Sequence, residues 1–153
     1  MFELVTKQHI DEQLIKLMGS NARQSSNKLA KQLAVSPATV RRRLNKLIDN
    51  NILRIVGIIN PVKAGFPIQA ILALDVAQEN VNSVLEALAS QPQIAWISST
   101  TGRYDVIVWA QFRSTEHLSS FLGNELASME GVRNCETFVA LRVAKAPYLQ
   151  SKP

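Results

Sequence analysis

Hydrophobic positions in the first third of the chain recur at the spacing of α-helices. Apolar side chains three or four residues apart lie on one face of a helix, and the remaining positions there are mostly polar. The pattern predicts a helix over residues 9–18 and a second, short helix capped by Ser26. Their buried sides are Ile10, Leu14 and Leu17 in the first helix and Leu29, Ala30 and Leu33 in the second.

A third predicted helix has the clearest start signal in the chain. Ser36 fits the N-cap position, and Pro37 fits the first helical position, where its missing N–H costs nothing. Asn50 and Asn51 can end the helix, because asparagine tolerates the left-handed conformation found at helix ends. The apolar stripe of this helix consists of Val40, Leu44, Leu47 and Ile48.

Three short helices, the last of them capped early and carrying three consecutive arginines, indicate a helix-turn-helix. Such a unit places the start of its last helix in the major groove of DNA. Arg42 can reach a guanine edge with two hydrogen bonds. The other candidate DNA-binding residues are Ser36, Ala38, Thr39 and Asn45, with Arg41, Arg43 and Lys46 as phosphate ligands. A structural three-helix bundle with a solvated basic face is the alternative.

The segment after the third helix is apolar and rich in β-branched residues. Residues 52–60 predict one strand or a short ribbon, which Asn60-Pro61 ends, and a second break follows at 65–67. We therefore expect a DNA-binding domain over residues 1–60, a linker over 61–67 and a second domain over 68–153. The apolar excess of the strand indicates that it pairs with another segment, most simply the same strand of a second subunit.

From Ile68 onward, strand-like alternation and helical spacing take turns. The order is β-α-β-β-α-β, which predicts a ferredoxin-like antiparallel sheet with both helices on one face. The fold class is therefore α+β, and we expect the last strand to run from Cys135 to Val143. The sheet face without helices carries Ile71, Ala73, Ile107 and Trp109, so we expect a second copy of the sheet to cover it.

Charge is distributed unevenly between the predicted domains. Residues 1–65 hold 11 Lys and Arg against 4 Asp and Glu, a net charge of +7, whereas residues 66–153 hold 6 against 8, a net charge of −2. A basic first half suits a polyanionic partner, although a solvated lysine-rich face would give the same count.

The rest of the composition excludes several classes of protein. Cys135 is the only cysteine, which excludes an intramolecular disulfide and a cysteine metal cluster and fits a reducing cytosol. His9 and His117 lack metal-ligand spacing, so no metal or cofactor is expected. No apolar run approaches the roughly 18 residues of a membrane helix, so we expect a cytoplasmic protein without a membrane partner.

One constellation in the second half has ligand chemistry, namely Thr101-Gly102-Arg103-Tyr104-Asp105. A glycine turn exposes backbone N–H groups that can receive a carboxylate, and Asp105 can receive an ammonium group. Together they suit a free amino acid. In the structural alternative, Gly102 only serves a hairpin turn and Asp105 only bonds backbone amides.

Three motifs occur in order along the chain: LAKQLAVSPATVRRRLNKL at 29–47, NPVKAG at 60–65 and TGRYD at 101–105. In these motifs the chain resembles the Lrp/AsnC (feast/famine) family of transcriptional regulators. The resemblance implies DNA binding by dimers, assembly of dimers into larger rings, and regulation by a small effector, commonly an amino acid. Asn51 and Asn60 stand where the family usually has Gly and Asp, and Arg103 occupies the variable position of the turn.

The expected function is a sequence-specific DNA-binding transcriptional regulator, not an enzyme. We expect its assembly or its DNA binding to respond to a small effector. Two alternatives remain open at the level of the sequence. A siroheme-decarboxylase-like enzyme could share the architecture, although the basic third helix argues against it. The chain could also be an architectural DNA-binding protein without an effector.

Overall fold

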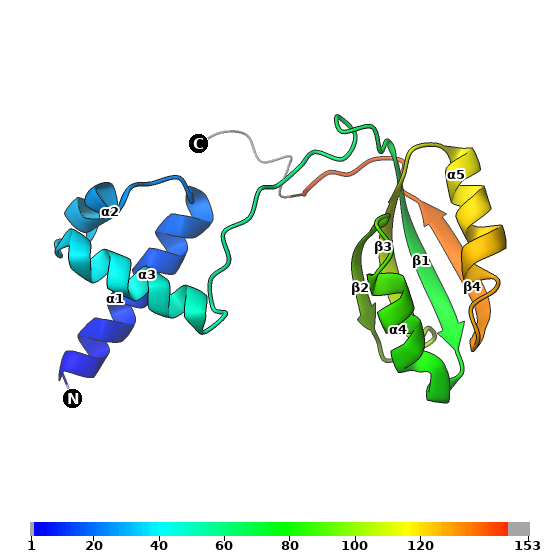
Figure 1. Ribbon diagram of the computed structural model, residues 1–153, viewed down its shortest axis with the longest axis horizontal. Helices are drawn as coiled ribbons and strands as arrows, with labels where there is room; N and C mark the ends of the chain where they lie inside the picture. Colours follow the sequence, from blue (N-terminus) through cyan, green and yellow to red (C-terminus); the bar gives the residue numbers. More distant parts are fainter. Residues whose placement is uncertain (1, 147–153) are drawn as a thin grey trace. The chain divides into compact units, whose positions relative to one another are not determined.

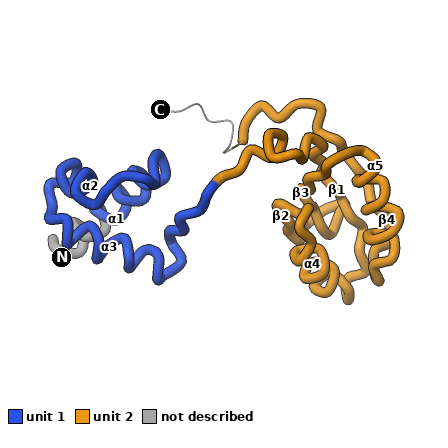
Figure 2. The backbone as a smooth tube through the Cα atoms, turned by 45° about the horizontal axis from the view of Figure 1, so that its top comes forward, with its two compact units in different colours: residues 1–57, 151–153 blue, residues 58–150 orange. Residues whose placement is uncertain are grey.

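The computed structural model describes residues 2–146, with side chains from His9 onward. The chain divides into two compact units, one ending at Gly57 and the other beginning at Ile58 (Figure 2). This division lies three residues before Asn60, the predicted end of the first domain. Each unit has its own hydrophobic core.

The first unit contains three helices, α1 (Phe2–Ser20), α2 (Ser26–Leu33) and α3 (Pro37–Asp49) (Figure 1). Their apolar stripes meet in one cluster, as the helical spacing predicts. The buried members are Leu14, Met18, Leu29, Ala30, Val40 and Leu47. Ile48, which the pattern places on the buried stripe, is 40% exposed.

The turn between α2 and α3 is tight. Ala34 ends α2 in the left-handed conformation, with φ +52° and its N–H bonded to the carbonyl oxygen of Ala30. The N-cap of α2 is Ser25 and not Ser26, because it is the Ser25 hydroxyl that accepts the N–H of Lys28. Either serine suits a cap, so the choice depends on where the preceding loop brings the backbone into the helix.

The predicted strand over residues 52–60 is wrong for the single chain. Residues 53–60 have no regular secondary structure and run as an extended trace (Figure 1). A strand needs a neighbouring strand with which it forms hydrogen bonds, and within residues 2–146 no strand pairs with this segment. The apolar side chains stay exposed, with Val56 at 62% and Ile59 at 72%.

The second unit is a four-stranded antiparallel sheet with the strand order β2-β3-β1-β4. This order and the connections between its elements confirm the predicted ferredoxin-like β-α-β-β-α-β fold. The elements are β1 (Ile68–Val76), a 3-10 turn η1 (Gln78–Asn80), α4 (Val81–Ala89), β2 (Ile94–Ser99), β3 (Val106–Phe112), α5 (Thr115–Ser120), a π-helical turn η2 (Phe121–Leu126) and β4 (Val132–Val139). The last strand therefore ends four residues before Val143, its predicted end, and Leu141 beyond it is 99% exposed.

The two faces of the sheet differ in burial. One face packs against α4 and α5 and forms a core that includes Leu72, Val108 and Phe112 (Figure 1). On the other face, Ile71 lies opposite Trp109 in the strand register. Large side chains there remain open, with Trp96 at 54% and Phe138 at 48% exposure. Among residues 2–146, no helix is long and apolar enough to cross a membrane.

Candidate DNA-binding helix and effector turn

The start of α3 is held by its own side chains. Ser36 has extended backbone angles, and its hydroxyl accepts the N–H of Thr39 at 3.1 Å. The two hydroxyl groups also lie within hydrogen-bonding distance of each other, at 2.9 Å. Pro37 occupies the first turn. The first turn of α3 is thus fixed before any ligand binds, as the sequence predicts from Ser36 and Pro37.

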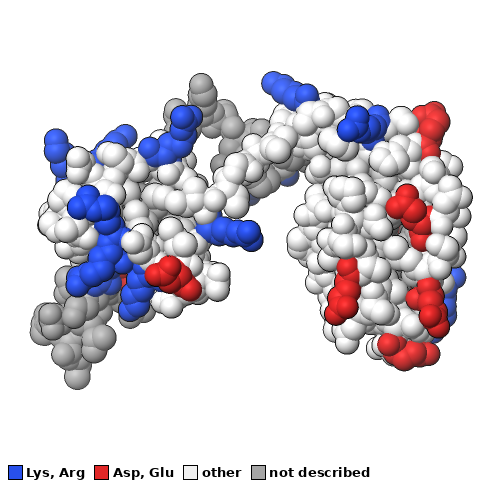
Figure 3. Space-filling model, viewed as in Figure 1, with Lys and Arg blue, Asp and Glu red and all other residues white. Residues whose placement is uncertain are grey.

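The outer face of α3 brings most of the predicted DNA-binding residues together. Val40 and Leu47 turn into the core, so the residues on the opposite side of the helix face solvent. The exposed candidates are Ala38, Arg41, Arg42, Asn45 and Lys46. Lys and Arg side chains gather over this unit, whereas Asp and Glu are the more visible charges on the second unit (Figure 3).

Arg43 departs from the other two arginines of the triplet. Its guanidinium donates to Asp11 of α1 at 2.9 Å, and its side chain is only 11% exposed. The structure therefore gives this residue a partner inside the domain, and the predicted phosphate contact does not follow from the geometry.

Exposed cations on α2 and before it were not among the sequence-based candidates. Lys28 and Lys31 lie on the solvent side of α2, and Arg23 is exposed in the preceding loop. In a helix-turn-helix, the helix before the recognition helix crosses the DNA backbone, so its cations are suited to phosphates. The spacing of the two lysines, three residues apart on the polar side of a short helix, is the signal that could have identified them.

The predicted effector turn is an exposed hairpin turn between β2 and β3. Gly102 has φ +111°, and no atom lies within 4 Å of the position a Cβ would take. Thr101 and Arg103 are also exposed. The turn is closed at its base, because the N–H of Thr100 donates to the Asp105 carbonyl at 2.9 Å and the Thr100 hydroxyl donates to the Tyr104 carbonyl at 2.6 Å.

Asp105 is occupied by contacts within the protein. Its Oδ2 accepts the backbone N–H of Val76 at 2.9 Å, and its Oδ1 accepts the Gln78 side-chain amide at 2.7 Å. Both carboxylate oxygens therefore hold the turn to the end of β1. The predicted bond to an effector ammonium group would have to compete with these contacts. They agree with the structural alternative in the sequence analysis, in which Asp105 bonds amide groups of the protein.

The neighbours of the turn come from distant parts of the chain. The Tyr104 hydroxyl donates to Glu136 of β4, and the Arg103 guanidinium lies 5.2 Å from the centre of the Tyr104 ring. The guanidinium of Arg133 lies 4.0 Å from the Asp105 carboxylate and donates to Asp75 at 2.8 Å through Nε. The hydrogen bond to Asp75 holds the pKa of Arg133 above its usual value. These partners are up to 58 residues apart in sequence, so no local pattern could have identified them.

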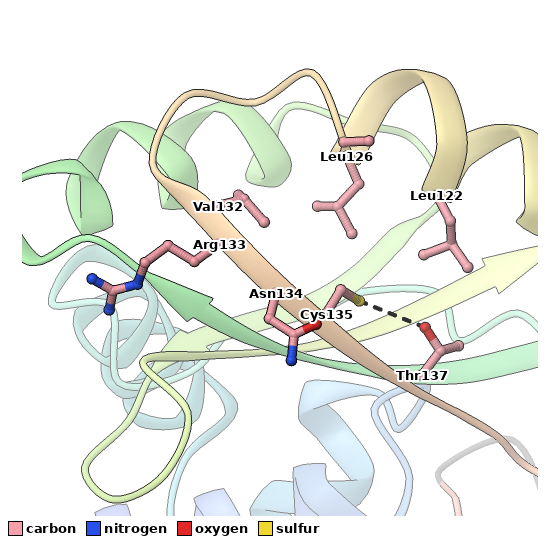
Figure 4. Close-up of a pocket in the computed structure, with 8 residues that line it drawn as sticks. Leu122, Leu126, Val132, Arg133, Asn134, Cys135 and Thr137 are labelled. Carbon is pink, nitrogen blue, oxygen red and sulfur yellow. Dashed lines mark hydrogen bonds between the residues drawn. The ribbon is translucent and has the colours of Figure 1, made fainter.

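A cavity of about 380 Å³ lies in the second unit between η2 and β4 (Figure 4). Leu122 and Leu126 line its helical side, and Cys135 and Thr137 line its strand side. None of its lining residues belongs to the TGRYD turn. Among residues 2–146, no group of three or more His, Cys, Asp or Glu could hold a metal ion.

Comparison with known families matches both halves of the chain. Residues 69–149 match the model of the Lrp/AsnC ligand-binding domain, and residues 7–54 match that of a winged helix-turn-helix DNA-binding domain. The chain belongs to the Lrp/AsnC family. The matched helix-turn-helix segment contains α3, and the matched Lrp/AsnC ligand-binding segment contains the TGRYD turn.

Relatives of this Lrp/AsnC chain are named as transcriptional regulators. An HTH-type transcriptional regulator of Pyrococcus abyssi is 31% identical over 140 residues, which cover 91% of this chain and 89% of the relative. The HTH-type transcriptional regulator Ptr1 of Methanocaldococcus jannaschii is 31% identical over 137 residues, covering 89% and 93%. The chain is accordingly a DNA-binding transcriptional regulator with a ligand-binding domain.

Solved structures share the fold over nearly the whole Lrp/AsnC chain. The structure of Escherichia coli AsnC superposes with a TM-score of 0.83 at 24% identity, covering 95% of this chain and 97% of AsnC. A transcriptional regulator of Neisseria meningitidis, solved in complex with L-Met, gives a TM-score of 0.83 at 22% identity, covering 90% and 91%.

Proposed function

We propose that this regulator binds specific DNA sequences through α3 and that a free amino acid changes its assembly or its DNA affinity. The observation that carries the proposal is the pairing of an exposed basic helix with a matched Lrp/AsnC ligand-binding domain in one chain. The L-Met complex of the Neisseria regulator supports an amino acid as the class of effector.

For DNA, the roles follow from exposure and side-chain chemistry. Arg42, with Ala38 and Asn45 beside it on the outer face, reads base edges in the major groove. Ser36 and Thr39 fix the helix start that enters the groove. The exposed cations contact phosphates: Arg41 and Lys46 on α3, Lys28 and Lys31 on α2, and Arg23 before it.

For the effector, the open side of the turn supplies the ligand groups. Thr101, Gly102 and Arg103 face outward, where backbone N–H groups and a guanidinium can receive a carboxylate. Tyr104 and Asp105 anchor the turn to β4 and β1. The turn is too small to enclose a ligand by itself, so a neighbouring subunit completes the pocket.

We place that neighbour on the open sheet face. A second copy would cover Trp96, Trp109 and Phe138, which one chain leaves partly exposed. Residues 52–60 of the two chains would then pair as the strand that the single chain lacks. An effector held between subunits favours one assembly over another and so couples binding to DNA affinity.

A screen of thermal unfolding against the twenty amino acids tests the proposal. An amino acid that binds the folded chain raises the melting temperature, and the most effective one is then used in DNA-binding and sedimentation measurements. If no amino acid changes any of the three, the chain is an architectural DNA-binding protein without this effector class. If the chain sediments as a monomer at micromolar concentration, the shared pocket is wrong.

Two glycine variants locate the site. Gly102→Val should abolish the response, because its side chain fills the open space above the turn. Gly65→Val is the matched control, because Gly65 also has positive φ (+92°) and open space but lies in a different turn. It should lose stability and keep the response. A Gly102→Val protein that responds like the parent would place the effector elsewhere.

A further inference from the structure

An ion pair inside the DNA-binding unit connects α1 to α3. Asp11 and Arg43 are 32 residues apart in sequence, and their charged groups meet at 2.9 Å. The pair is largely shielded from water, with 11% of the Arg43 side chain and 25% of the Asp11 side chain exposed. It is therefore an internal contact, unlike the exposed charges on the outer face of α3.

The hydrogen bonding of the Asp11–Arg43 pair is incomplete. Oδ1 of Asp11 is buried and has no hydrogen-bond partner among the residues that the structure describes. A buried ion pair recovers its desolvation cost only when the remaining polar atoms are also satisfied, and apolar side chains of similar size are often as good or better for stability. The pair is thus a poor choice for stability alone, although its two directional groups fix how two helices meet.

The three consecutive arginines of α3 point in different directions. Successive residues of a helix are turned by about 100°, so the triplet cannot point to one side. Arg41 and Arg42 are exposed, and neither has an ion pair within the described part of the chain. Arg43 turns toward α1. The sequence offers three arginines to DNA, but the fold presents two.

We propose that Asp11 withholds Arg43 from DNA and uses it to set the angle between α1 and the recognition helix. Arg43 is then a positioning residue: it decides where Arg42 and Asn45 meet the base edges without contacting DNA. The inference rests on DNA binding through α3 and is independent of the effector.

The first test is the salt dependence of binding to a mixed-sequence duplex of 30 base pairs. The slope of log K against log salt is negative, and each lost phosphate contact makes it less steep by about 0.9. A dimer that loses one contact per subunit therefore has a slope less steep by about 1.8. Arg41→Met, the control for a true phosphate ligand, should show this loss. Arg43→Met should keep the parental slope.

The second test separates positioning from simple stability. Arg43→Met alone leaves Asp11 unpaired, so the double variant Asp11→Leu/Arg43→Met is measured beside it. This variant removes the pair and replaces it with apolar groups, so it should unfold at or above the parental temperature. Its preference for a duplex selected by the parent from a random pool, over a shuffled duplex, should fall about tenfold, as for one lost base contact.

The outcomes decide the inference directly. If the salt slopes of Arg43→Met and the double variant become less steep by as much as that of Arg41→Met, Arg43 is a phosphate ligand and the proposal is wrong. If the double variant folds and keeps the parental preference, the pair does not set the angle. If the double variant keeps the parental salt slope but loses its preference for the selected duplex, both parts of the proposal are supported: Arg43 does not contact DNA, and it positions the recognition helix. If Arg41→Met also leaves the slope unchanged, Arg41 is not a phosphate ligand, and the sequence preference of the double variant alone decides the proposal.

Discussion

Replacing Asp105 with alanine should destabilise the second unit. The carboxylate accepts the N–H of Val76, a fully buried residue, at 2.9 Å, and it accepts the Gln78 amide at 2.7 Å. Its side chain is about one-fifth exposed. The variant therefore leaves a shielded backbone N–H without an acceptor and frees the start of the loop after β1.

The magnitude follows from these two bonds. A hydrogen bond to a charged group contributes about 1.5–3 kcal/mol, and an exposed bond such as that of Gln78 contributes at the low end or less. We expect a loss of about 2–4 kcal/mol in the free energy of unfolding. For a unit of this size, each kcal/mol lowers the melting temperature by about 4–8 °C, so the expected shift is about 8–32 °C.

Tryptophan fluorescence reports this unit alone. The chain has two tryptophans, Trp96 and Trp109, and both lie in the sheet of the second unit. Thermal unfolding followed by their emission, at equal protein concentration, separates the expected loss from changes in the first unit. DNA affinity without effector should stay close to the parental value, because α3 keeps its own core.

Asp75→Ala is the matched control. Asp75 is a carboxylate of the same sheet end, but its side chain is 42% exposed and its partner Arg133 is 57% exposed. Exposed ion pairs contribute about 0–1 kcal/mol, so the control should shift unfolding far less. Equal melting temperatures for Asp105→Ala and the parent would refute the anchoring role of Asp105 and restore its carboxylate as a candidate effector ligand.

Other outcomes can be measured on the same protein. The anisotropy of a labelled duplex should give a log K against log salt slope of about −9, if the five exposed cations of each subunit of a dimer all neutralise phosphates. Arg42→Ala should cost on the order of 1–3 kcal/mol on a selected duplex and less on a shuffled one, whereas Lys46→Ala should weaken both equally; an unchanged ratio for Arg42→Ala would rule out base reading. Ser36→Ala should cost the first unit about 1 kcal/mol, seen by helical circular dichroism. Burial raises the pKa of the Cys135 thiol, so at pH 8 it should react with a disulfide reagent more slowly in the folded chain than in urea; equal rates would contradict its burial.

Local signals and alternation were enough to predict much of this structure. Ser36 and Pro37 define the start of α3 through contacts within four residues, and period-two patterns identify the strands of the sheet. The segment 52–60 could not be predicted in the same way, because its side chains indicate a strand but a strand forms only with a partner. Ser25 and Ser26 are equivalent in the sequence, and only the path of the loop selects the cap.

The site was predicted less completely than the fold. The residues on the outer face of α3 follow from a helical repeat, which the sequence displays. The partners of Arg43 and Asp105 are 32 and 29 residues away, and many other carboxylates and amides could have served. Electrostatic partners depend on how elements pack, so the sequence predicts that a charged residue needs a partner but not which one.

The two hydrophobic cores share no residue, and this has a consequence for how such regulators diversify. The core of the first unit is built from residues up to Leu53, and the core of the second begins at Ile68. A recombination event between these positions would leave both cores whole, so a chimera should inherit two foldable halves. The DNA sequence preference of the first unit and the effector response of the second can then evolve separately. A library of such fusions would change one of these properties while keeping the other.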